Sequence, residues 1–105
     1  MNRGDIYAFN PKKNGTHEIQ GKRFAVVLQS DSLLNRSLVI IAPTSQSARP
    51  ASIRPDIQVQ NQPTKVLVEQ MTSVSIERLG KRVGRVDIED QWAINDAIVA
   101  VLGLN

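Results

Sequence analysis

The chain has 105 residues, no cysteine, one histidine and a formal net charge of +3 at neutral pH. This length suits one hydrophobic core, and the missing cysteines exclude disulfides, thiol catalysis and thiolate zinc sites. With one histidine, no apolar run long enough to span a membrane and no signal peptide, the sequence predicts a single cytoplasmic domain, residues 1–105, that needs no metal or other cofactor.

The first half of the chain predicts short strands separated by polar loops. Ile6–Phe9 has the pattern of a short strand, and a nearby proline ends it. Residues 10–22 follow as a polar loop that is too long for a tight hairpin. The aliphatic runs Ala25–Gln29 and Leu38–Ala42 are typical of strands buried on both faces, and Ser30–Arg36 between them has room for one helical turn.

The second half is predicted to be less regular. Pro43 opens a long irregular stretch that contains three further prolines. Ser73–Leu79 has a capping serine and is followed by Gly80, which predicts a short helix or 3₁₀ turn. Short strands are expected at Ser52–Arg54, Ile57–Val59, Lys65–Gln70 and Arg82–Val86.

The last segment predicts one long helix. Asp87 is placed to cap it, and acidic residues in the first turn suit the positive end of the helix dipole. Gly103 is placed to end it, and the apolar side chains that share one face are Ile94, Ala97, Ile98 and Val101. Five or six strands and this C-terminal α-helix predict a mainly β fold, a small and strongly bent barrel that the helix plugs or flanks.

Polar segments lie next to three of the expected strands. Arg23 precedes the second strand, Thr44 and Ser45 follow the third, and Glu69-Gln70 ends a later one. We expect these strand ends to converge, although Arg23 in a salt bridge, Thr44 in a turn and Glu69 paired with a nearby charge are the ordinary alternatives. Residues 1–68 carry nine Lys and Arg against four Asp and Glu, which favours a polyanionic partner. Only four aromatic rings are present, so if the partner is a nucleic acid, contacts to its backbone should dominate over base stacking.

The order and spacing of these segments resemble the MazF/PemK (Kid) toxins of bacterial toxin–antitoxin pairs. The resemblance spans nearly the whole chain, and its motifs are Arg3-Gly4-Asp5-Ile6, Glu18-Ile19-Gln20-Gly21-Lys22-Arg23, Ala25-Val26-Val27, Pro43-Thr44-Ser45-Gln46, Glu69-Gln70-Met71 and Ser75-Ile76-Glu77-Arg78-Leu79. The chain departs from the family pattern at Phe24, where the family has proline, at Glu69, often aspartate, and at Leu67, arginine in some members. These departures bear on which RNA sequence is read.

The resemblance implies a dimeric, SH3-like barrel of the CcdB/PemK toxin kind that cuts single-stranded RNA without metal. In that chemistry Arg23 and Thr44 would stabilise charge on the phosphoryl oxygens, and Glu18 or His17 would serve as acid or base, with their roles left open. It also implies an acidic antitoxin whose extended tail fills the RNA-binding groove. The residues expected to bind RNA are Lys12, Lys13, Gln20, Gly21, Lys22, Ser45, Gln46, Arg49, Glu69 and Gln70.

Two other functions compete with this one. A barrel of the same kind could act without catalysis, as CcdB does on DNA gyrase, through Trp92 and residues 103–105. A plain SH3-like module could instead bind a peptide or RNA, although such modules line their groove with several aromatic side chains. Replacing Arg23 separates the first alternative from the nuclease, and incubating the protein with RNA in EDTA separates the second.

Overall fold

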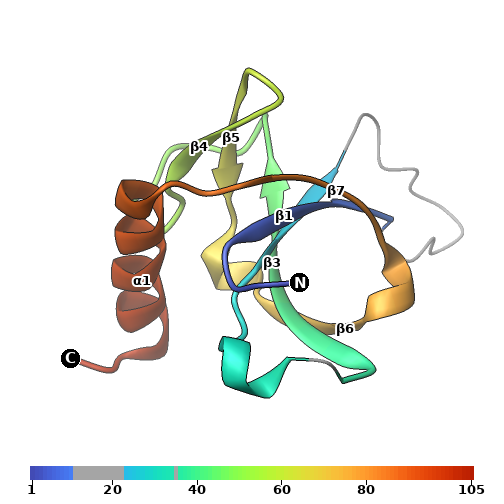
Figure 1. The fold of residues 1–105 in the computed structure, drawn as a ribbon. Helices are drawn as coiled ribbons and strands as arrows, with labels where there is room; N and C mark the ends of the chain where they lie inside the picture. The colour runs from blue at the N-terminus through green and yellow to red at the C-terminus, as the bar shows by residue number, and fades with distance from the viewer. Residues whose placement is uncertain (11–22, 35) are drawn as a thin grey trace, which may run out of the picture.

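The computed structural model describes residues 1–10, 23–34 and 36–105. Seven strands form one bent sheet, and a single α-helix ends the chain (Figure 1). The strands are β1 (Asp5–Phe9), β2 (Phe24–Val27), β3 (Leu38–Ser45), β4 (Asp56–Val59), β5 (Gln62–Val66), β6 (Thr72–Ser75) and β7 (Leu79–Arg85). Three 3₁₀ turns, η1 (Asp31–Leu33), η2 (Val68–Gln70) and η3 (Ile76–Arg78), connect them, and α1 runs over Ile88–Leu102. The predicted fold class is confirmed.

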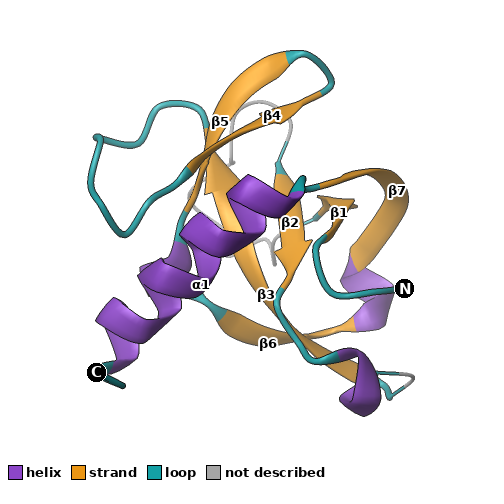
Figure 2. Cartoon of the chain, turned by 60° about the vertical axis from the view of Figure 1, so that its left-hand side comes forward, coloured by secondary structure: helices purple, strands orange, loops and turns teal. Residues whose placement is uncertain are grey.

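The sheet is bent so strongly that several of its strands enclose a hydrophobic interior of their own, apart from the core beneath α1. Its order is β4-β5-β3-β2-β1-β7, every pair is antiparallel, and β6 pairs with β3 beside this path. In Figure 1, β1, β7, β6 and β3 curve around a common centre. Helix α1 lies across the opposite side of the sheet, as the turned view shows (Figure 2). The helix therefore flanks the barrel.

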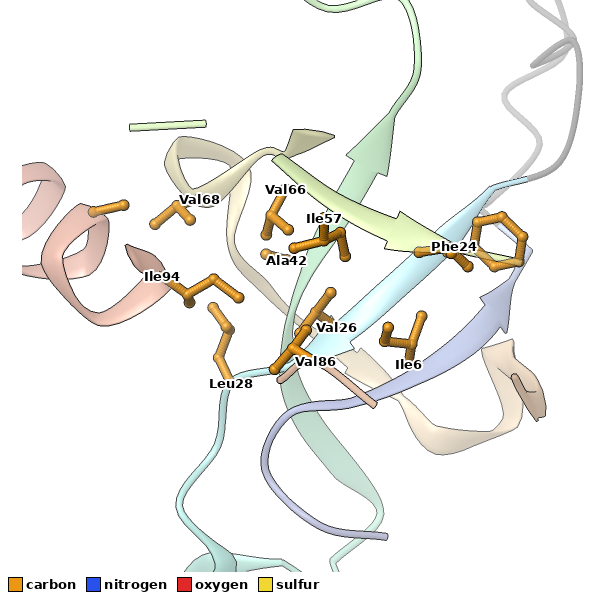
Figure 3. Packing of buried hydrophobic residues seen from close by; sticks show 12 residues of the cluster. Ile6, Phe24, Val26, Leu28, Ala42, Ile57, Val66, Val68, Val86 and Ile94 are labelled. Atoms are coloured by element: carbon orange, nitrogen blue, oxygen red, sulfur yellow. The ribbon is translucent and has the colours of Figure 1, made fainter. Parts of the chain in front are cut away.

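Two hydrophobic clusters pack against opposite faces of the sheet. The larger cluster joins α1, through Ile94 and Ala97, to residues of β2, β3, β4, β5 and η2 (Figure 3). The smaller cluster fills the curved interior and includes Phe9, Val39, Ile41 and Val74. Strand β2 contributes to both, because Phe24 and Val26 face the helix while Ala25 and Val27 face the interior. The expectation that this strand is buried on both faces is confirmed.

Strand β3 differs from its prediction in two ways. Its first residues are buried on one face only, because Leu38 and Ile40 are 54% and 42% exposed. The strand also runs on through Pro43 to Ser45, so the irregular stretch begins later than expected. Pairing continues around Pro43, because its carbonyl accepts a hydrogen bond from the Leu67 N–H at 2.8 Å and Thr44 pairs with Val66 in β5.

In three other segments the predicted secondary structure is wrong. Ser52–Arg54 is a turn closed by the Arg54 N–H on the Ala51 carbonyl, and β5 ends at Val66 before the 3₁₀ turn η2. Within Ser73–Leu79 only η3 is helical, because the preceding residues pair with β3 as β6. Gly80, expected to close a helix, lies inside β7.

Helix α1 begins and ends where the sequence predicts. The Asp87 carboxylate accepts a hydrogen bond from the Asp90 N–H at 2.8 Å, which satisfies one of the free donors of the first turn. Gly103 adopts a left-handed conformation with φ +67° and stops the helix. Among the described residues, no helix has the length and apolarity that a membrane crossing requires.

Replacing Asp87 by alanine is expected to lower the free energy of unfolding by about 1 kcal/mol, because the cap hydrogen bond is lost. Asp96→Ala is the matched control, since Asp96 is exposed in the middle of the same helix and should change stability little. Urea denaturation followed by circular dichroism measures both. Equal losses in the two variants would contradict a capping role for Asp87.

Candidate functional site

The antiparallel pairing of β2 and β3 brings Arg23 to Thr44. Arg23 lies directly before β2, and the register pairs Ala25 with Pro43, so the start of β2 lies beside the end of β3. The Arg23 Nη1 donates a hydrogen bond to the Thr44 carbonyl oxygen at 3.1 Å. Arg23 itself is half-buried. The expected proximity of these two residues is therefore present in the structure.

The Thr44 side chain is less accessible than the sequence suggested. Thr44 is 2% exposed, and its hydroxyl donates to the Phe24 carbonyl oxygen at 3.3 Å. This distance is long for a hydroxyl donor, whose hydrogen bonds usually measure about 2.8 Å. The hydroxyl proton is thus held by a weak internal bond, and donating it to a ligand would require exchanging that bond.

Ser45 and Gln46 end β3 next to this pair. The Ser45 hydroxyl accepts a hydrogen bond from the Ser47 N–H at 3.3 Å, a local turn of the kind expected for serine. Ser45 is 8% exposed, whereas Gln46 is exposed. The polar end of β3 therefore presents the Gln46 amide to solvent more readily than the Ser45 hydroxyl.

Glu69 is engaged by an arginine that the sequence did not single out. Arg54 donates from Nε to Glu69 Oε2 at 2.8 Å, and its Nη2 lies 2.6 Å from the same oxygen. Arg54 also donates to the Arg49 carbonyl oxygen at 3.0 Å. The hydrogen bond from Arg54 is the main reason why the pKa of Glu69 is lowered, and burial opposes it. Glu69 Oε1 is buried without a partner among the described residues, while Gln70 is exposed.

The Arg54–Glu69 pair predicts a pH-dependent contribution to stability. Because the folded state lowers the Glu69 pKa, the contribution is complete above the ordinary glutamate pKa of about 4.3 and is lost as the pH falls through the lowered value. The difference in unfolding free energy between the wild type and Glu69→Gln should therefore shrink as the pH is lowered from 6 to 3, which urea titrations would measure. A difference that stays constant over this range would contradict the ion pair.

A second arginine that sequence reasoning missed, Arg78, lies over Phe9, the residue that pairs with Arg23. The Phe9 N–H donates to the Arg23 carbonyl at 3.0 Å, so these two residues face each other across β1 and β2. The Arg78 guanidinium carbon lies 5.1 Å from the centroid of the Phe9 ring, and Arg78 Nε donates to the Asn10 carbonyl oxygen at 3.3 Å. Arg78 could have been found from the sequence, because it lies in the last motif that resembles the family. Arg54 lies in none of these motifs, so the sequence held no signal for it.

The remaining predicted site residues divide into two groups. Arg49 is exposed on the loop before β4, where its carbonyl contacts Arg54. In the part of the chain that the structure describes, no cluster of three or more His, Cys, Asp or Glu side chains is arranged to hold a metal ion. The predictions that lie outside the described residues concern Lys12, Lys13, His17, Glu18, Gln20, Gly21 and Lys22.

The fold is thus that of a small bent β-barrel with a flanking C-terminal helix and a corner that joins Arg23 to Thr44. The chain belongs to the PemK-like, MazF-like toxin family of type II toxin–antitoxin systems, whose family model matches residues 2–102. It is 36% identical over 105 residues to a Mycobacterium tuberculosis protein named "Putative toxin Rv3098A/RVBD_3098A", with 97% of each chain covered. The chain is therefore a toxin of a toxin–antitoxin system.

Solved structures support the same fold at low sequence identity. Mycobacterium tuberculosis toxin MazF-mt6 superposes with a TM-score of 0.78 and 17% identity over 96% of this chain and 98% of the toxin. An endoribonuclease in complex with its cognate antitoxin from a mycobacterial species superposes with a TM-score of 0.81 and 17% identity, and the match covers 100% of this chain and 97% of the endoribonuclease. MazF from Deinococcus radiodurans superposes with a TM-score of 0.80 and 17% identity, and the match covers 98% of this chain and 96% of that MazF chain.

Proposed function

We propose that this toxin is a sequence-specific endoribonuclease that cuts single-stranded messenger RNA without a metal ion. The observation that carries the proposal is the Arg23 guanidinium held 3.1 Å from the Thr44 carbonyl at the corner where β2 begins and β3 ends. Arginine has five N–H donors in a planar fork, and the Thr44 carbonyl takes one of them. A fork fixed in this way suits two oxygens of a phosphodiester.

The proposed reaction is an internal transfer at phosphorus. The ribose 2′-oxygen attacks the adjacent phosphorus and loses its proton to a base, while the bond to the 5′-oxygen breaks and that oxygen takes up a proton. The products are a 2′,3′-cyclic phosphate and a 5′-hydroxyl. Negative charge grows on the non-bridging oxygens during the attack, and Arg23 is placed to stabilise it. Glu18 and His17 are the sequence-based candidates for base and acid.

Thr44 has a supporting role in this proposal. Its backbone carbonyl orients the Arg23 guanidinium, and its hydroxyl is the nearest side-chain donor to be recruited when RNA displaces the weak bond to Phe24. Gln46 and Gln70 expose amide groups that can read the edges of unpaired bases. The predicted binding residues in the 12–22 segment would add cations along the backbone of the RNA.

We further propose that the toxin acts in the cytoplasm as a homodimer and is blocked by an acidic antitoxin. One similar solved structure is titled an endoribonuclease in complex with its cognate antitoxin, and another is titled MazE-MazF from Deinococcus radiodurans. The surplus of Lys and Arg over residues 1–68 is complementary to an acidic antitoxin tail. Inhibition by such a tail should weaken as salt is raised.

The test is to incubate the purified protein with a long RNA of defined sequence in excess EDTA and to map the cut ends. The expected result is cleavage at a recurring short sequence, with 5′ ends that polynucleotide kinase labels without prior phosphatase treatment. A 2′-O-methyl copy of the same RNA is the control, because it lacks the attacking hydroxyl and should stay intact. Intact RNA over a wide set of sequences would refute the nuclease.

A further inference from the structure

Strand β7 carries an exposed run of cations that the proposed site does not use. Lys81, Arg82 and Arg85 are all exposed, and the side chains of the two arginines keep 50% and 54% of their accessible surface. We call these three residues the β7 strip. The strand is the last in the order of the sheet, where it pairs with β1, so the strip lies along an outer border of the barrel (Figure 1).

A buried carboxylate lies within ion-pair distance of the two arginines of the β7 strip. Asp5, whose side chain is 3% exposed, places Oδ1 3.2 Å from Arg82 Nε and 3.9 Å from Arg85 Nη1. Neither contact has hydrogen-bond geometry, and Asp5 Oδ2 accepts instead from the Asn2 N–H at 2.8 Å. One carboxylate therefore lies within ion-pair distance of two guanidinium groups and offsets one positive charge, which leaves guanidinium donors for a ligand.

The β7 strip is continuous with the corner that holds Arg23. Phe9 pairs with Arg23 on one side and with Leu79, the first residue of β7, on the other. Arg78, directly before β7, covers the Phe9 ring. Because of two bulges, β7 pairs along only the five residues of β1, so at about 3.3 Å per residue it extends the cationic surface by roughly 13 Å from that corner. This length accommodates successive phosphates of one strand.

We propose that the β7 strip binds the phosphate backbone of the substrate RNA beyond the cleavage site. The inference rests on the proposed endoribonuclease function and adds a binding surface to it. Arginine forks match phosphate oxygens, and the pairing through Phe9 places the β7 strip on the strand that leads away from the corner that holds Arg23. An acidic peptide is the competing occupant, and the path to Arg23 is the observation that favours RNA.

The test compares Lys81→Gln/Arg85→Gln with the wild type on two RNAs, one that spans only the cut site and one that extends well beyond it. This variant leaves Arg82 on Asp5 at the shorter of the two distances, so the buried carboxylate keeps a partner. For the long RNA we expect a raised KM, an unchanged kcat and a plot of log affinity against log salt that is flatter by about 1.4, because two phosphate contacts are lost. For the short RNA we expect no change.

Two controls make the result specific. Arg36→Gln removes an exposed cation before β3 that does not belong to the β7 strip, and it should leave the length dependence intact. Lys81→Arg/Arg85→Lys keeps the charge and should behave as the wild type, with an unchanged melting temperature. Equal effects of Lys81→Gln/Arg85→Gln and Arg36→Gln, or equal effects on the short and long RNA, would overturn the proposal.

Binding of the uncleavable 2′-O-methyl RNA separates this proposal from the nuclease itself. If the wild type binds that RNA and the glutamine variant binds it with a flatter salt dependence, the β7 strip is supported even where cleavage fails. If cleavage depends on Arg23 but the glutamine variant binds as the wild type does, the strip is refuted while the nuclease stands. Weaker binding of polyglutamate with unchanged RNA binding would assign the strip to an acidic peptide and overturn the proposal.

Discussion

Arg23→Ala is expected to lower kcat/KM for RNA cleavage by at least about 10²–10³, the usual loss when one fixed donor to a developing oxyanion is removed. The Thr44 carbonyl positions the Arg23 guanidinium at the corner where β2 begins and β3 ends. Alanine removes both the charge and the fork. Single-turnover cleavage of a fluorescent RNA would measure the loss, because it separates the chemical step from product release.

Two comparisons show whether this loss comes from the phosphate fork. Arg23→Lys keeps the charge without the planar donors and should recover only part of the activity. Arg23→Ala should unfold at nearly the same urea concentration as the wild type, since the half-buried side chain donates one recorded hydrogen bond. Toxicity in cells should disappear with Arg23→Ala, and toxicity that persisted would favour a poison of DNA gyrase.

Ile94→Ala is expected to lower the free energy of unfolding by about 2–5 kcal/mol. Ile94 is 0% exposed and lies where α1 packs against Leu28 and Val68 (Figure 3). Alanine there removes buried apolar surface and leaves a cavity that a helix anchored to the sheet closes only in part. For a chain of this length the melting temperature should fall by about 10 °C or more.

The matched control is Ile88→Ala on the same helix. Ile88 is 66% exposed, so the same chemical change removes little buried surface and should shift stability by no more than about 0.5 kcal/mol. Denaturant titrations of both variants give the comparison directly. Similar losses in the two variants would contradict a specific contribution from the packing of Ile94 on the sheet.

The parts of the fold that depend on local signals could be predicted. Asp87, the apolar spacing and Gly103 define α1 within the segment itself, and the continuous apolar run of β2 identifies a strand buried on both faces. The hairpin between β4 and β5 could not be predicted, because its two turn residues, Gln60 and Asn61, both have positive φ without a glycine. Strand β6 was also missed, since only its pairing with β3 makes it a strand.

The candidate site shows the same division between local and distant contacts. The proximity of Arg23 and Thr44 follows from the motifs that resemble the toxin family, and the structure has it. Two other contacts join residues that are far apart in the sequence. The Thr44 hydroxyl donates to the Phe24 carbonyl, and Arg54 donates to the Glu69 carboxylate. The spacing of residues along the chain does not predict these contacts, and the sequence therefore indicates no role for Arg54.

Strand β2 belongs to both hydrophobic clusters, and Ala25, Val26 and Val27 are each 0% exposed. Its amide protons should therefore exchange with deuterium only when the whole molecule unfolds, because no partial opening frees this strand from both sides. The backbone that carries Arg23 is thus anchored to the last region to open. In such a toxin the start of β2, and with it the backbone beside Arg23, should stay next to the end of β3 until the whole molecule unfolds.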